Sequence, residues 1–84
     1  MKNKIRKITE SFPDYKYDME TTIWDWVIYF NDEDKKFFFE LPNHKDKSKN
    51  DNHKVKMLIE GEWIIFEGEN IDELIEKTKQ KLEI

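Results

Sequence analysis

The chain has 84 residues, of which 37% are hydrophobic, 14% aromatic and 40% charged, with a formal net charge of −4. This length suits one domain with one core, and the three Trp, three Tyr and six Phe supply apolar area that disordered chains lack. The absence of cysteine excludes disulfide scaffolds, thiolate metal sites and cysteine nucleophiles. Because no segment has the apolar core of a signal peptide or of a membrane-spanning helix, we expect a cytoplasmic protein without membrane contact.

The N-terminal segment predicts a short helix followed by an ambiguous stretch. Ile5, Ile8 and Phe12 recur at three- and four-residue spacing, and Pro13 ends the helix. Residues 14–22 carry alternating Tyr and Met side chains, which fits either an irregular entry or the start of a long strand.

Residues 23–41 predict a β-hairpin. Residues 23–30 alternate large apolar side chains, residues 31–34 are a polar turn, and residues 36–41 return with Phe37 and Phe39 on one side. Pro42 ends the second strand because it cannot donate a hydrogen bond to the sheet. Residues 43–54 contain no apolar side chain, so we expect a mobile polar loop there.

A second hairpin and a helix complete the expected fold. Residues 55–59 and 62–67 are joined by Glu60 and Gly61, which fit a two-residue turn. Asn70 is a candidate N-cap of the final helix, and Glu73 stands where a capping box needs it. The prediction is one α+β domain over residues 1–84, with an antiparallel sheet of two hairpins (about four strands), a C-terminal helix packed on it and a short N-terminal helix.

The sequence offers little that predicts catalysis, a cofactor or a metal site. Ser48, His44 and His53 all lie in the polar loop, where catalytic geometry is hard to maintain, and the two glycines stand apart rather than forming a phosphate loop. Asp46 and Asp51 join the two histidines as possible ligands, but a mobile loop must be ordered before it can bind a metal. We therefore expect a non-enzyme with no catalytic residues, no cofactor and no metal.

The order of elements resembles that of double-stranded-RNA-binding domains, which place strands between two helices. In those domains a lysine cluster begins the last helix, whereas this chain carries the acidic run 69–73 at the matching place. Such a run repels phosphates, so nucleic acid is not the expected partner. A further alternative remains a small nucleic-acid-binding protein that uses the polar loop and the basic residues Lys2, Lys4, Arg6 and Lys7.

Residues 60–76 contain seven acidic residues and no basic one. We interpret most of them as a carboxylate surface, the acidic edge, that meets a basic protein partner. Its predicted residues are Glu60, Glu62, Glu67, Glu69, Asp72 and Glu76. The alternative interpretation is a solvated rim that keeps a small protein soluble.

The predicted strands are apolar on both faces, although one C-terminal helix covers only one face. Tyr29 and Phe38 lie on the second face, together with either Trp63 and Ile65 or their neighbours 64 and 66. Either the N-terminal segment covers this face, or it is the interface of a homodimer or of another partner.

Two short segments resemble known inhibitor families. The strand-to-helix junction over residues 66–74, and the hairpin over 27–42, are similar to those of HicB-type antitoxins, and residues 68–72 resemble the capped inhibitory helix of barstar. Together with size and charge, this favours a non-enzymatic acidic protein-binding module. It would occlude a basic nucleic-acid-binding or nuclease-type surface, as phage anti-defence (including anti-CRISPR), antitoxin and immunity proteins do. The alternative is a structural or assembly protein that forms a homo-oligomer through the second sheet face.

Overall fold

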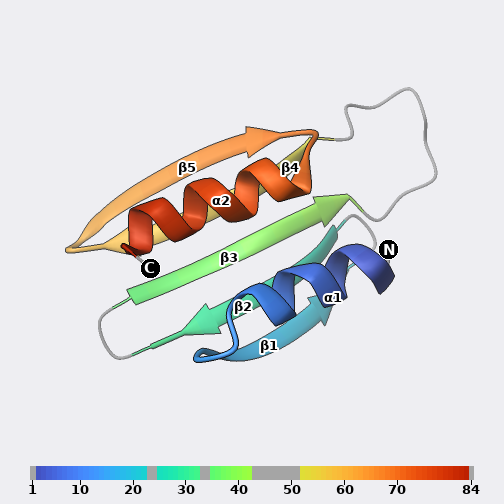
Figure 1. The fold of residues 1–84 in the computed structure, drawn as a ribbon, viewed down its shortest axis with the longest axis horizontal. Helices are drawn as coiled ribbons and strands as arrows, with labels where there is room; N and C mark the ends of the chain where they lie inside the picture. The colour runs from blue at the N-terminus through green and yellow to red at the C-terminus, as the bar shows by residue number, and fades with distance from the viewer. Residues whose placement is uncertain (1, 23–24, 33–34, 43–51, 84) are drawn as a thin grey trace.

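The computed structural model describes residues 2–22, 25–32, 35–42 and 52–83, which form one antiparallel sheet and two helices (Figure 1). The helices are α1 (Lys2–Ser11) and α2 (Ile71–Leu82). The strands, which lie in the sheet in chain order, are β1 (Lys16–Thr21), β2 (Asp25–Asn31), β3 (Lys35–Pro42), β4 (His53–Ile59) and β5 (Glu62–Gly68). The α+β class, both hairpins and both helices are confirmed, but the sheet has five strands rather than about four.

The additional strand is β1, for which the sequence left two interpretations open. It pairs antiparallel with β2 from Lys16 opposite Asn31 to Thr21 opposite Trp26. The backbone N–H of Thr22 donates to the Asp25 carbonyl at 2.8 Å, so β1 turns back beside β2 instead of continuing into it. All six residues of β1 are exposed, because the strand forms an edge of the sheet.

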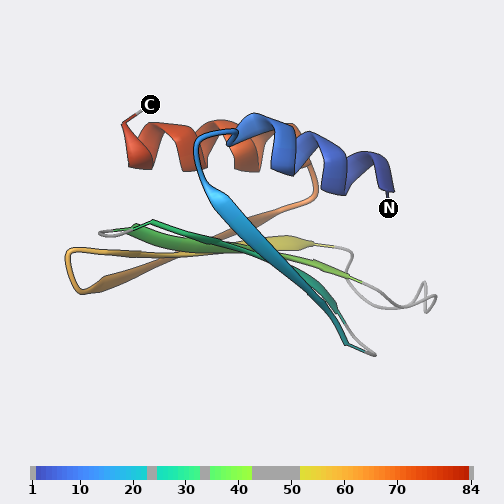
Figure 2. The same ribbon diagram turned by 90° about the horizontal axis from the view of Figure 1, so that it is seen from below.

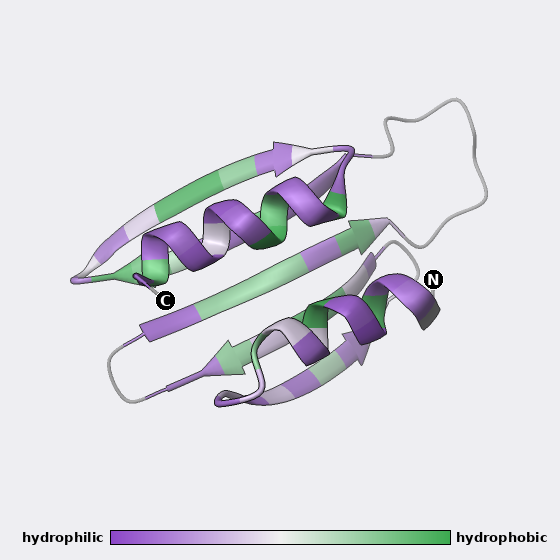
Figure 3. Cartoon of the chain, viewed as in Figure 1, coloured by the Kyte–Doolittle hydropathy of each residue, from purple (hydrophilic) through white to green (hydrophobic). Residues whose placement is uncertain are grey.

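Both helices lie on the same face of the sheet, and Figure 2 shows them as one layer above it. The centre of β3 is apolar in sequence, whereas β1 is mostly hydrophilic (Figure 3). The core lies between the two layers, and α2 contributes to it a stripe of side chains at three- and four-residue spacing. The buried residues of α2 are Ile71, Leu74, Ile75, Thr78 and Leu82.

Helix α1 is held by aromatic packing at its C-terminal end. It has no acidic residue in its first turn, so its sequence gives it no favourable charge at the helix N-terminus. Phe12, which follows its last turn, is 1% exposed and packs against the rings of Phe30 and Phe37, with centroids 5.2 and 5.1 Å away. Tertiary contacts therefore fix this helix on the sheet.

The predicted turn of the second hairpin and the predicted N-cap of α2 are present. Glu60 and Gly61 have φ of 52° and 79°, the left-handed values that a type I′ hairpin turn requires. The Asn70 side chain accepts hydrogen bonds from the backbone N–H groups of Asp72 and Glu73, as an N-cap does. Within the described residues, no helix is long and apolar enough to cross a membrane.

The end of the predicted polar loop needs a correction. Residues 43–51 lie outside the described part of the chain, but His53 and Lys54 belong to β4 rather than to a loop. His53 is 3% exposed, and its Nε2 lies 3.0 Å from the Lys4 Nζ. Because a lysine ammonium can only donate, this ring nitrogen accepts the hydrogen bond. Sheet pairing and contact with α1 thus bury a residue whose polar neighbours in sequence predicted exposure.

Candidate protein-binding surfaces

The predicted acidic edge is exposed throughout, but the structure divides it. Glu60 and Glu62 lie at the turn between β4 and β5, whereas Glu67 and Glu69 lie at the opposite end of β5. Glu67 follows Glu62 by five residue steps of extended strand, about 17 Å at 3.4 Å per residue. The four glutamates therefore border the edge strand β5 at its two ends.

The two remaining acids of the acidic edge lie elsewhere, on the side of α2 that faces α1. The Lys7 Nζ lies 2.9 Å from the Asp72 Oδ1, which joins the two helices through an exposed ion pair. Glu76 follows Asp72 by four residues and shares its side of the helix. Lys77 and Lys81 lie on the other side of the buried stripe, closer to β5. The helix therefore does not continue the carboxylates of β5 into one surface.

The sheet face opposite the helices carries the second candidate surface, which we call the open face. Strand register orders its residues into three rows that each cross all five strands. The first row is Lys16, Asn31, Lys36, Leu58 and Trp63. The middle row is Asp18, Tyr29, Phe38, Lys56 and Ile65. The third row is Glu20, Val27, Glu40, Lys54 and Glu67.

Aromatic and aliphatic side chains occupy the centre and one margin of the open face. The Tyr29 and Phe38 rings lie 5.4 Å apart, and Phe38 meets Trp63 edge to face at 6.2 Å. Trp63 is 58% exposed and Ile65 57% exposed. The sequence placed Tyr29 and Phe38 on this face; the register shows that Trp63 and Ile65 join them, while Ile64 and Phe66 face the helices.

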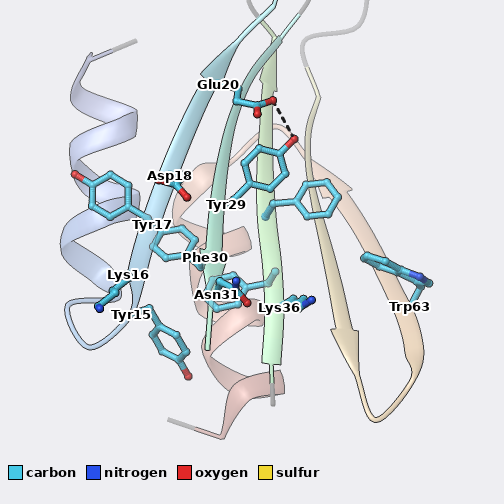
Figure 4. Close-up of a pocket in the computed structure, with 12 residues that line it drawn as sticks. Tyr15, Lys16, Tyr17, Asp18, Glu20, Tyr29, Phe30, Asn31, Lys36 and Trp63 are labelled. Carbon is cyan, nitrogen blue, oxygen red and sulfur yellow. Dashed lines mark hydrogen bonds between the residues drawn. The ribbon is translucent and has the colours of Figure 1, made fainter. Parts of the chain in front are cut away.

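A hollow of about 910 Å³ is lined by residues of β1, β2 and β3, with Trp63 of β5 at its far side (Figure 4). Tyr29 lies in it, and its hydroxyl donates to the Glu20 carboxylate at 3.5 Å. Partial desolvation raises the pKa of the Tyr29 phenol, and the charge of Glu20 raises it further. Both effects favour the neutral phenol, which remains a hydrogen-bond donor at neutral pH.

Charge on the open face is balanced overall and polarised along the strands. The face holds four lysines and four carboxylates, although the whole chain has a formal charge of −4. The first row contains lysines and no acid, whereas the third row contains three glutamates and one lysine. In the middle, the Lys56 Nζ lies 3.3 Å from the Glu40 Oε1 and 5.7 Å from the Phe38 ring centre.

The groups considered for catalysis and metal binding are not brought together in the described part of the chain. The Ser11 hydroxyl donates to the Lys7 carbonyl within α1 at 2.6 Å, and His53 is buried beside Lys4. His44, Asp46, Ser48 and Asp51 lie outside the described residues. Among the residues that are described, no three His, Asp or Glu side chains are grouped to hold a metal ion.

Comparison of this chain with protein-family models, with curated proteins and with solved structures gives no match. The local similarities of the junction 66–74 and of the hairpin 27–42 to inhibitor families therefore remain predictions from short segments. Any functional conclusion depends on the two surfaces described above.

Proposed function

We propose that this protein is a non-enzymatic binding module that acts as an inhibitor by covering a basic surface of another protein. Four carboxylates carry the proposal: Glu60, Glu62, Glu67 and Glu69, which border β5. All four are exposed, and none forms an ion pair with another described residue. Their charge is therefore available to a partner, unlike that of Asp72, which Lys7 already neutralises.

The position of these carboxylates suits a surface-covering role. β5 is an edge of the sheet, so no other strand of the described part of the chain pairs with one side of its backbone. Carboxylates at both ends of an edge strand attract a basic partner and orient it along the strand. A nucleic-acid-binding surface has the required chemistry, because its lysines and arginines are spaced to meet successive negative charges.

The test compares two double charge reversals of equal size. Glu62→Lys with Glu69→Lys changes the two ends of β5 and leaves the open face intact. Glu10→Lys with Asp14→Lys changes two exposed acids at the far end of α1 and serves as the matched control. Circular dichroism and thermal unfolding establish that both variants fold.

Each protein is then immobilised and exposed to lysate, and retained proteins are identified by mass spectrometry. We expect wild type and the control to retain one protein with a basic surface, with retention falling steeply between about 50 and 500 mM salt. The variant with Glu62→Lys and Glu69→Lys should no longer retain this protein. Equal retention by all three proteins, or the absence of any specifically retained protein, would contradict the proposed function.

A further inference from the structure

The charge pattern of the open face matches a second copy of itself. Its basic first row and acidic third row lie two residues to either side of the middle row on each strand. On β1 these positions are Lys16 and Glu20, and on β3 they are Lys36 and Glu40. The same alternation on two strands gives the face opposite charges at its two ends.

We propose that two copies pack open face to open face, around a two-fold axis that crosses the strands along the middle row. This axis places the first row of each copy over the third row of the other. Lys16 then faces Glu20 of the second copy, and Lys36 faces Glu40 of the second copy. Because the interface is isologous, each of these pairs is made twice.

A second simple arrangement of the two faces is unfavourable because it brings like charges together. A two-fold axis parallel to the strands would place each row over itself. Lys36 would then meet Lys36 of the second copy, and Glu40 would meet Glu40. The proposed axis also keeps the strands of the two sheets nearly aligned, as they are in β-sandwiches, where aligned sheets differ by about 30°.

The middle row supplies the apolar contact across the proposed axis. Tyr29, Phe38 and Ile65 of the two copies meet there, and burial of these side chains is the main gain in free energy. Asp18 and Lys56 also meet their own copies. Asp18 lies on the exposed edge strand β1, where salt and solvent screen its repulsion. Each Lys56 Nζ already lies 3.3 Å from a Glu40 carboxylate. The pair neutralises both lysines, so their repulsion is small.

The size of the face sets the expected affinity. Five strands about 4.8 Å apart, with about seven residues each, give roughly 600 Å² per copy. The total of about 1,200 Å² is at the lower limit for stable interfaces. We therefore expect a monomer–dimer equilibrium with a dissociation constant in the micromolar range.

The dimer shares one residue with the proposed function, Glu67, which belongs to the third row of the open face. Glu62 and Glu69 lie outside this face, so their charge reversal tests the proposed function separately from the dimer. Its axis also places β5 beside β5 of the second copy. The carboxylates of both copies then line one side of the dimer, where they would double the acidic surface offered to a partner.

The decisive experiment uses two complementary variants. The acidic variant carries Lys16→Glu and Lys36→Glu, and the basic variant carries Glu20→Lys and Glu40→Lys. Each variant alone places like charges over each other, so its homodimer should dissociate at least about tenfold more readily than that of wild type. Mixed in equal amounts, the two variants place opposite charges together at all four positions and should form a 1:1 dimer.

Sedimentation equilibrium from about 1 to about 500 µM measures these states, a range that covers micromolar dissociation constants. A control with Lys77→Glu and Lys81→Glu has the same charge change on α2 and should dimerise as wild type does. If Glu40→Lys unfolds the chain, the single variants Lys16→Glu and Glu20→Lys provide the same mixing test.

The proposal fails if wild type stays monomeric over the whole range. It also fails if the acidic and basic variants each dimerise as wild type does, because that would locate the contact elsewhere, such as at the edge strand β5. A mixture that remains monomeric while wild type dimerises overturns the axis. A monomeric wild type that still binds a basic partner through Glu62 and Glu69 leaves the proposed function standing.

Discussion

Removing the ring of Phe12 should cost this small domain a large part of its stability. Phe12 is 1% exposed, and its ring lies within 6.3 Å of four other rings, those of Tyr15, Phe30, Phe37 and Phe39. Truncation of a buried Phe to Ala costs about 3–5 kcal/mol. A chain of this length has a total free energy of unfolding of about 4–13 kcal/mol. At the lower end of that range, Phe12→Ala should leave the domain partly unfolded, and at the upper end it should remove at least about a quarter of the stability.

Urea denaturation followed by circular dichroism measures the effect. With a denaturant slope of about 1 kcal/mol per molar urea, the midpoint should fall by about 3 M or more. Phe12→Leu, which keeps most of the volume, should cost less than half as much as Phe12→Ala. Tyr17→Ala is the control, because Tyr17 is 51% exposed although its ring lies 6.0 Å from Phe30. Equal midpoints for Phe12→Ala and Tyr17→Ala would refute the conclusion that Phe12 anchors α1.

Three further substitutions test local features. Asn70→Ala removes the acceptor of two backbone N–H groups and should lower stability by about 1 kcal/mol in urea unfolding, while Asn70→Asp should not. Glu60→Asn, at a φ of 52°, should raise the free energy of unfolding by about 0.5 kcal/mol or more, since Asn-Gly favours this turn, and a lower free energy of unfolding would count against it. Burial raises the pKa of Tyr15, so the neutral phenol stabilises the fold below about pH 10 and this contribution is lost as pH rises through the folded pKa. Tyr15→Phe should therefore lose less stability than wild type in alkaline solution, and identical pH profiles would contradict this.

Apolar periodicity predicted most of the fold because the buried side chains follow it closely. Phe37, Phe39 and Leu41 alternate in the sequence and are all buried under the helices. The three- and four-residue spacing of the α2 stripe is equally regular. Where one face of a helix or strand is covered, apolar residues recur in the sequence at the spacing of that face.

Strand β1 is harder to predict because all six of its residues are exposed within the described structure. Lys16, Asp18 and Glu20 point to the open face, and Tyr17 and Met19 remain 51% and 46% exposed on the helix side. An edge strand of this kind is held mainly by backbone pairing with β2, which leaves little trace in the choice of side chains. Alternation alone therefore does not distinguish this edge strand from an irregular segment.

The composition of the candidate surfaces could not be predicted from the sequence, because it depends on contacts between residues that are far apart in the chain. Glu67, Glu69 and Asp72 are close in sequence, but Asp72 meets Lys7, which lies 65 residues away. Similarly, the opposite charges of the open face become visible only when the register places Lys16, Lys36 and their acidic counterparts in separate rows. Periodicity within the two hairpins could have predicted the rows on β2 to β5, but not the contribution of β1.

The placement of both helices on one side of the sheet determines how the protein can be handled. α1 begins at Lys2 and α2 ends at Leu82, and both of these helix ends lie in the helix layer (Figure 2). An affinity tag, a fluorescent protein or a surface linker attached at either end therefore starts on the side away from the open face. Sensor-chip immobilisation and cell-surface display can use either terminus without blocking the sheet.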